Sequence, residues 1–290
     1  MSYEGARSST RDPSEPQGES VSEAQPSLIY AREGPIVVLT MNRPERRNAL
    51  SMDMIVRFAD AWQEIEADDA IRAVILTGAA GAYCVGGDLS TGWMAGNRDY
   101  EPTPHEKRAA QDASLITRGL LLNSWLRKPI VAAVNGDCLG GGCEMLQSTD
   151  IRIAEAHARF GVPEATRGLI AGAGSTMRLK RQIPYAVAME MLLTGRILDA
   201  EEALRWGLVT HLVPTGAGLA KAREIAGVLA AAGPLSVAAS KASAIETGWL
   251  PEDQASPIEL GYAARVMSSK DAKEGIKAFK EKRAPKFTGR

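Results

Sequence analysis

The sequence of 290 residues is poor in cysteine, histidine and aromatic residues. Its three cysteines, Cys84, Cys138 and Cys143, are an odd number without a CxxC pair, which argues against a disulfide framework. The three histidines are scattered, and no spacing of His, Cys and Asp is typical of a metal site. We therefore expect reduced thiols, no metal, and a cytoplasmic protein without a signal peptide.

The chain also lacks an excess of charge and a long apolar run. It carries 34 basic and 35 acidic residues, so no global field favours nucleic acid or a membrane surface as a partner. The most apolar region, residues 225–239, is interrupted by Gly227, Gly233 and Pro234, which argues against a transmembrane helix. Apolar residues make up 45% of the chain, enough for a sizeable core in one large domain or two smaller ones.

Residues 1–27 are rich in Ser, Glu, Pro and Gly and nearly devoid of large aliphatic side chains. Such a segment cannot bury enough apolar surface to order itself, so we predict a disordered tail. Order should begin at Leu28.

Strands and helices alternate in the predicted order of the first two-thirds of the chain. Residues 28–41 read as a β-hairpin that turns at Glu33-Gly34-Pro35, and Ser51 is the expected N-cap of a helix. Short buried strands are predicted at 71–78 and 129–136, and more strand at 150–161. From about Ser175 onward the spacing is helical, up to a last helical stretch at 258–282. The layout predicts an α/β core followed by a helical C-terminal part.

Several glycine-based motifs are absent. No GxGxxG or GxSxG occurs, and the GxxxxG spacing of Gly81 to Gly86 is followed by Gly87 where a phosphate loop has lysine. Cys143 has no histidine near it in the sequence, and we interpret it as a small buried thiol rather than a nucleophile. Nucleotide-binding and hydrolase interpretations are therefore not supported.

Two glycine stretches remain, "AYCVGGDL" at 82–89 and "LGGGCE" at 139–144. Each follows a predicted strand, and the second opens a predicted helix, whose first N–H groups lack partners. Two such donors converging on one oxygen would form an oxyanion hole. Glu144 stands just behind the triple glycine, and Glu164 follows Pro163. Two glutamates at such a site could serve as general acid and general base. The alternatives are tight strand–helix turns, a helix-start carboxylate and a surface loop residue.

Six segments together resemble the enoyl-CoA hydratase/isomerase (crotonase) family. They are "NRPERRNAL", "AYCVGGDL", "VNGDCLGGGCEM", "FGVPEATRGLIAGAGSTMRL", "MLLTGRILDAEEALRWGLV" and "AFKEKRAPKF", and the resemblance spans about residues 28 to 287. The resemblance implies an α/β fold, a spiral of ββα turns at 28–230 with a helical region at 231–290. It also implies a homotrimer or a dimer of trimers that binds acyl-CoA thioesters, with no cofactor beyond the CoA of the substrate.

The resemblance also implies residue roles. Gly87 and Gly141 would donate their backbone N–H groups to the thioester oxygen of an enolate. Glu144 would help to hold and activate the water that adds to C3, and Glu164 would share that water and exchange the proton at C2. Isomerase members of the family usually keep a carboxylate at the second position and lose the first. Both glutamates are present here, so the resemblance favours a 2-enoyl-CoA hydratase. The alternatives are a Δ3,Δ2-enoyl-CoA isomerase and a non-catalytic acyl-CoA-binding paralogue.

The CoA contacts are carried over in the same way. Six residues are implied as substrate or CoA contacts: Arg47, Ala49, Asp88, Leu89, Phe279 and Lys282. Phe279 and Lys282 belong to a last helix that often closes on the nucleotide of a neighbouring subunit in the family. Solvated surface charges are the alternative for the two cations.

Two departures from the family pattern leave the acyl group open. Ala171 stands where many hydratases have proline, and residues 90–111 match no family segment. Trp93, Met94 and Met145 are candidates to line an acyl tunnel, with ordinary core packing as the alternative.

Overall fold

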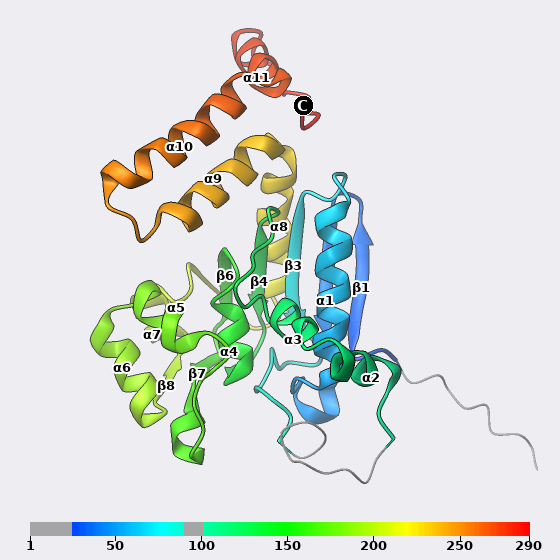
Figure 1. Cartoon of the computed structure of the whole chain (residues 1–290), viewed down its shortest axis with the longest axis vertical. Helices are drawn as coiled ribbons and strands as arrows, with labels where there is room; N and C mark the ends of the chain where they lie inside the picture. The colour runs from blue at the N-terminus through cyan, green and yellow to red at the C-terminus, as the bar shows by residue number, and fades with distance from the viewer. Residues whose placement is uncertain (1–24, 90–100) are drawn as a thin grey trace, which may run out of the picture.

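The computed structural model describes residues 25–89 and 101–290, and Trp93 and Met94 lie outside this range, as does most of the predicted tail. Two sheets organise the chain (Figure 1). The larger has the strand order β1-β2-β3-β4-β6-β9, and the smaller has the order β5-β7-β8. The strands are β1 (Leu28–Glu33), β2 (Ile36–Met41), β3 (Ala73–Gly78), β4 (Ile130–Val134), β5 (Asp137–Leu139), β6 (Ile151–Glu155), β7 (Arg159–Gly161), β8 (Ile197–Asp199) and β9 (His211–Val213).

The spiral arises because successive turns of the chain after β3 send strands to both sheets. β4 enters the large sheet and β5 the small one, and β6 and β7 repeat this division. β1 and β2 form the expected antiparallel hairpin, whereas β2, β3, β4, β6 and β9 run parallel. In the small sheet β5 and β7 are parallel and β8 is antiparallel to β7. Isolated parallel bridges join Leu50 to Gly87 and Cys84 to Cys138.

Helices cover both faces of the large sheet, as Figure 1 shows for α1 and α8. On α1, the apolar residues Met54, Ile55, Phe58 and Ile65 are fully buried in the main core. On the opposite face Ala222 and Ala226 of α8 pack on Val38 and other strand residues. The helices of the core are α1 (Met52–Ala67), α2 (Pro104–Gln111), α3 (Ser114–Gly119), α4 (Gly141–Leu146), α5 (Ser175–Gln182), α6 (Tyr185–Thr194), α7 (Ala200–Arg205) and α8 (Gly218–Ala231). Two 3-10 turns are η1 (Pro44–Arg46) and η2 (Pro163–Arg167).

Three C-terminal helices extend away from the two sheets, at the upper end of Figure 1. They are α9 (Pro234–Thr247), α10 (Glu252–Met267) and α11 (Lys270–Lys280). Within residues 25–89 and 101–290 no single helix is long and apolar enough to cross a membrane. The α8–α9 pair together meets that test of length and composition, with a bend of 107° between its helices.

The structure corrects three details of the predicted layout. Residues 150–161 form two strands, β6 and β7, because the chain turns between them and changes sheet. The C-terminal third also contains strands β8 and β9, which are only three residues long and give no readable alternation. The stretch 258–282 is two helices, because Ser269 caps the start of α11 with its hydroxyl.

Candidate active site

The two glycine stretches of the sequence lie against each other. A methyl group on Gly86 would lie 3.2 Å from the backbone nitrogen of Gly141, and one on Gly141 would lie 3.6 Å from that of Gly87. Gly86 and Gly140 have positive φ angles of 102° and 51°, which favour glycine. The glycines are therefore required by close backbone approach, and this approach brings two N–H groups together.

Both N–H groups are left free by the secondary structure around them. Leu50 bonds to the carbonyl oxygen of Gly86 at 2.8 Å and to the N–H of Asp88 at 3.0 Å, so the N–H of Gly87 points away from Leu50. Gly141 is the first residue of α4, where a helix provides no partner for the N–H. Neither N–H group is therefore used by the neighbouring bridge or by the helix.

Glu144 lies one turn into α4 and is only 3% exposed. Its carboxylate Oε1 accepts a hydrogen bond from the backbone N–H of Ser175 at 3.2 Å. Burial raises the pKa of Glu144 to about 7, and the negative charge of Glu164 adds to the increase. The Ser175 N–H and the Arg178 guanidinium act in the opposite direction. Glu144 is thus a buried carboxyl that can change its protonation state near neutral pH.

Glu164 lies in η2 and approaches the triple glycine from the other side. Its Oε1 would lie 3.1 Å from a methyl group on Gly140. Its Oε2 is buried and has no hydrogen-bond partner among the described residues. Burial raises its pKa as well. A buried carboxylate oxygen without a partner is costly, and it marks a place where a ligand or water would bind.

A pocket of about 400 Å³ opens beside Glu164 and the glycine stretches. Six of the residues predicted from the sequence line it: Arg47, Ala49, Gly87, Asp88, Leu89 and Glu164. Gly141 and Glu144 do not line this pocket, but they contact its walls through Gly86 and the adjoining Gly140. The predicted catalytic residues therefore come together in one place.

The predicted CoA contacts near this pocket are already engaged with protein groups. Asp88 is 4% exposed and pairs with Arg43 at 2.8 Å. The carbonyl oxygen of Ala49 accepts from Arg43 at 2.7 Å. Arg47, at a left-handed φ of 50°, pairs with Asp137, which also holds Arg159 at 2.7 Å. Arg47 is thus exposed but not simply solvated.

The two predicted contacts from the last helix lie elsewhere in this chain. Phe279 is 86% exposed on α11, and Lys282 follows the helix at a left-handed φ of 51°. Neither lines the pocket, and α11 lies far from α4 in Figure 1. Within one chain the structure does not bring them to the site.

Two residues that shape the site were not predicted from the sequence. Asn48 is fully buried at a left-handed φ of 57°, and its side chain bonds to Arg43 N at 2.9 Å and to the Ala82 carbonyl at 2.7 Å. It thereby ties the "RRNAL" segment to the start of the "GGD" stretch. Arg178 projects from α5 toward Ser148 and the carbonyl of Leu121. The only sequence signals for Asn48 and Arg178 are their residue types and their positions inside segments that resemble the family.

Three buried side chains lie behind the site. Cys84, Cys138 and Cys143 are free thiols and fully buried, and burial raises the pKa of Cys84 to about 12. This burial agrees with the interpretation of Cys143 as a packed thiol. Met145 is 3% exposed and belongs to the main core, so core packing accounts for it.

Comparisons with known proteins agree on one family. The profile of the enoyl-CoA hydratase/isomerase family matches residues 31–290. Enoyl-CoA hydratase EchA19 of Mycobacterium tuberculosis is 44% identical over 268 residues, which cover 92% of this chain and 98% of that protein. The (E)-benzylidenesuccinyl-CoA hydratase of Thauera aromatica is 38% identical, with 88% of this chain and 96% of that protein covered.

Solved structures agree with the sequence matches. The crystal structure of an enoyl-CoA hydratase from Bacillus anthracis superposes with a TM-score of 0.83 at 33% identity, and covers 91% of this chain and all of that one. An enoyl-CoA hydratase from Mycobacterium tuberculosis superposes with a TM-score of 0.81 at 34% identity, over 92% of this chain and all of that one. The chain therefore belongs to the enoyl-CoA hydratase/isomerase family and has the crotonase fold of ββα turns with C-terminal helices.

Proposed function

We propose that this protein is an enzyme that adds water across the 2,3 double bond of an enoyl-CoA thioester. The observation that carries the proposal is the pair of glutamates, Glu144 and Glu164, which burial holds with raised pKa values beside two free backbone donors. Named hydratases among the relatives support it. Neither a cofactor nor a metal ion is needed in this mechanism.

The thioester carbonyl oxygen would accept hydrogen bonds from the N–H groups of Gly87 and Gly141. Negative charge develops on that oxygen when water attacks C3, because the electrons of the double bond move into an enolate. Donors already fixed in place stabilise this charge without having to reorganise. The close packing of Gly86 and Gly87 against Gly141 supports this role, because it holds the two nitrogens near each other.

The two glutamates would share the attacking water. One carboxylate takes a proton from the water as its oxygen bonds to C3, and the proton required at C2 is delivered by the other carboxyl. A group with a pKa near the working pH performs such transfers best. The pKa of Glu144, about 7, fits this requirement. The Oε2 of Glu164 has no hydrogen-bond partner among the described residues and could accept a hydrogen bond from the water.

The test is the hydration of a panel of 2-enoyl-CoA thioesters, followed by the loss of absorbance of the conjugated thioester and by product mass. Glu164→Gln and Glu144→Gln are close in shape to the native side chains. We expect each to lower the hydration rate by roughly 10²-fold or more. The double variant should lose little beyond either single variant, because both residues act on one water.

The same variants separate hydration from isomerisation. Moving a double bond requires one group that removes and returns a proton, so only Glu164→Gln should matter greatly for an isomerase. A Glu144→Gln variant that hydrates at the wild-type rate contradicts the proposed role of Glu144. Absence of hydration across the whole panel by the wild-type protein contradicts the proposal itself.

We further propose a homotrimer or a dimer of trimers located in the cytoplasm. Apolar side chains on the C-terminal helices support assembly: α10 has no buried residue in the single chain, and Leu260 and Met267 on it are 66% and 67% exposed. In such an assembly Phe279 and Lys282 would contact the CoA bound to a neighbouring subunit. The three free thiols fit a reducing compartment.

A further inference from the structure

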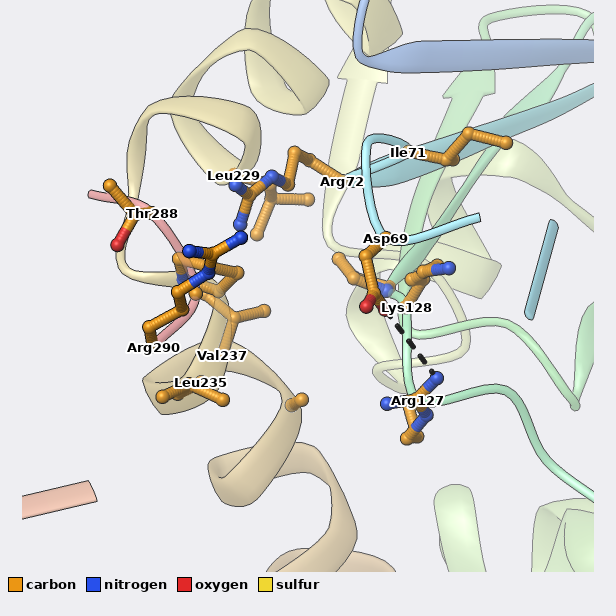
Figure 2. A pocket seen from close by; sticks show the side chains of 14 residues that line it. Asp69, Ile71, Arg72, Arg127, Lys128, Leu229, Leu235, Val237, Thr288 and Arg290 are labelled. Atoms are coloured by element: carbon orange, nitrogen blue, oxygen red, sulfur yellow. Dashed lines mark ion pairs between the residues drawn. The ribbon is translucent and has the colours of Figure 1, made fainter. Parts of the chain in front are cut away.

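A second pocket lies at the amino ends of the central strands β3 and β4 of the large sheet. Its volume is about 290 Å³. Four parts of the chain line it: the segments just before β3 and β4, the end of α8 with the first turn of α9, and residues 288–290 (Figure 2). The candidate active site is built from the carboxyl ends of the same strands, so the two pockets are separate.

Four cationic side chains line this pocket, and two of them are already occupied. Lys128 donates to the carbonyl oxygens of Glu66 and Asp68 at 3.2 and 2.7 Å, and so caps the end of α1. Arg127 pairs with Glu66 and lies 3.9 Å from Asp69. Their charges are largely compensated by these groups.

The guanidinium groups of Arg72 and Arg290 have no ion pair or side-chain hydrogen bond within the described part of the chain. Arg72 approaches the end of the chain: its Nη1 would be 3.7 Å from a methyl group on Gly289, the neighbour of Arg290. In Figure 2 the head groups of Arg72 and Arg290 point toward each other at the upper part of the pocket. Two neighbouring like charges repel each other, and an anion bound between them would remove this repulsion.

The position of Arg290 is fixed by backbone contacts. Asp271 is 4% exposed, and its carboxylate accepts hydrogen bonds from the N–H groups of Thr288 and Gly289 at 2.7 and 2.8 Å. The carbonyl oxygen of Arg290 accepts from the N–H of Asp271 at 3.1 Å. The end of the described chain is therefore held against the pocket, with its side chain directed toward Arg72.

We propose that this pocket binds a phosphate group, the anionic part of a small phosphate monoester, between Arg72 and Arg290. The charge of a phosphate dianion matches two guanidinium groups, and its several oxygens match two planar forks of N–H donors. A carboxylate has only two oxygens, which one arginine fork satisfies.

Two further features suit the same ligand. The N–H of Leu235, in the first turn of α9, has no partner within the helix and adds positive potential at this wall. Leu229 and Val237 also line the pocket, and a volume of 290 Å³ leaves room for an apolar group attached to the phosphate. Asp69 is the one lining acid, and it is 93% exposed and directed toward Arg127.

The experiment is a titration of the full-length protein with inorganic phosphate and with phenyl phosphate, observed by phosphorus NMR at constant ionic strength. We expect saturable binding of both, tighter for phenyl phosphate because its ring covers the apolar wall. Arg72→Gln and Arg290→Gln should each weaken binding about 10-fold or more, as expected for a charge-assisted hydrogen bond. Arg205→Gln, an exposed arginine on α7, is the matched control and should change nothing.

A phosphate bound in the candidate active site would behave differently. Such binding would be lost in Arg47→Gln and kept in Arg72→Gln, and that pattern overturns the proposal. Absence of saturable binding at tens of millimolar phosphate overturns it as well. Because the side chain of Arg290 is exposed, Arg290→Gln should fold even if Arg72→Gln does not. In that case the proposal depends on whether Arg290→Gln weakens phosphate binding.

Discussion

At the residue scale, Glu144 combines deep burial with an ionisable group, and this conflict has a consequence for stability. Its pKa rises from an ordinary 4.5 to about 7 in the folded protein, chiefly through burial. A carboxyl with a raised pKa binds its proton more tightly when folded than when unfolded. The folded state therefore loses stability as the pH rises from about 4.5 through 7, when the buried group ionises.

The first prediction is that Glu144→Gln makes the protein more stable at alkaline pH while removing activity. The free energy of unfolding should exceed that of the wild type by roughly 3 kcal/mol above pH 8, and the difference should vanish near pH 4. Urea unfolding at a series of pH values measures it. Glu33→Gln is an internal control of opposite sign, because the hydrogen-bonded Arg223 lowers the pKa of Glu33. A pH-independent difference for Glu144→Gln would contradict the prediction.

The second prediction concerns Arg178, which acts on Glu144 from α5. On that helix the N–H of Ser175 bonds to Glu144, and the side chain of Arg178, one turn later, bonds to Ser148. The guanidinium favours the ionised form of Glu144, whereas burial and Glu164 oppose it. Removing the charge in Arg178→Gln should raise the pKa of Glu144, so the acidic limb of kcat/KM should move to higher pH.

The pH profile distinguishes this electrostatic role from a structural one. The rate at pH 6 should fall by roughly 10-fold for each pH unit by which the acidic limb moves, while the rate on the alkaline side of the optimum should change little. Arg178→Lys keeps the charge and loses the planar contact to Leu121, so its limb should stay in place. Equal losses at every pH in both variants would indicate a structural role instead.

At the scale of elements, the packing of α4 against the "CVGGD" stretch limits what its glycines can become. A methyl group on Gly142 would lie 2.3 Å from the carbonyl oxygen of Cys84 and 2.7 Å from its Cβ. Neither group can move without shifting backbone that forms the site. On Gly141 the nearest atom would be the flexible end of Leu50, at 3.0 Å.

The third prediction is that Gly142→Ala destabilises the protein by at least about 1–3 kcal/mol, because overpacking against backbone cannot relax. Gly227→Ala is the matched control: this glycine lies within α8, and a methyl group there meets nothing within 4 Å. Gly227→Ala should be neutral or stabilising by roughly 0.5–1 kcal/mol. Thermal unfolding of the two variants measures the contrast, and equal midpoints would show that the close approach is not rigid.

Elements with local signals were predictable from the sequence. The hydroxyl of Ser51 accepts from the N–H of Met54, as its position before an amphipathic stretch indicated. The triple glycine opens α4 as predicted. β8 and β9 were missed because three residues carry no period and depend on their partner strands. Asn48 was missed because its role comes from bonds to residues more than thirty positions away.

At the scale of the whole molecule, the C-terminal helices present apolar groups that the single chain does not cover. Trp249, between α9 and α10, and Leu260 and Met267 of α10 are each more than 60% exposed. The sequence placed Phe279 and Lys282 at a CoA site only through family resemblance. Spacing along one chain cannot reveal a contact that another subunit would make, so this part of the site stays a prediction.

The fourth prediction is that Phe279→Ala raises KM for an enoyl-CoA thioester without destabilising the fold. Phe279 is 86% exposed in the single chain, so its loss should change the free energy of unfolding of that chain by less than about 0.5 kcal/mol. The increase in KM should appear only in the assembled protein, which light scattering identifies. An unchanged KM in a trimer or hexamer would contradict a role for Phe279 in CoA binding.

The three buried thiols make the active-site backbone accessible to kinetic measurement. Cys84 lies three residues before Gly87, Cys143 lies two residues after Gly141, and both thiols are buried. An alkylating reagent cannot reach them until the glycine stretches separate, and the high pKa of Cys84 keeps it unreactive until then. The rate of alkylation therefore measures how often the two glycine stretches separate, and no probe has to be attached to the protein. A bound thioester whose oxygen accepts from both Gly87 and Gly141 should hold the two stretches together and lower the rate of alkylation.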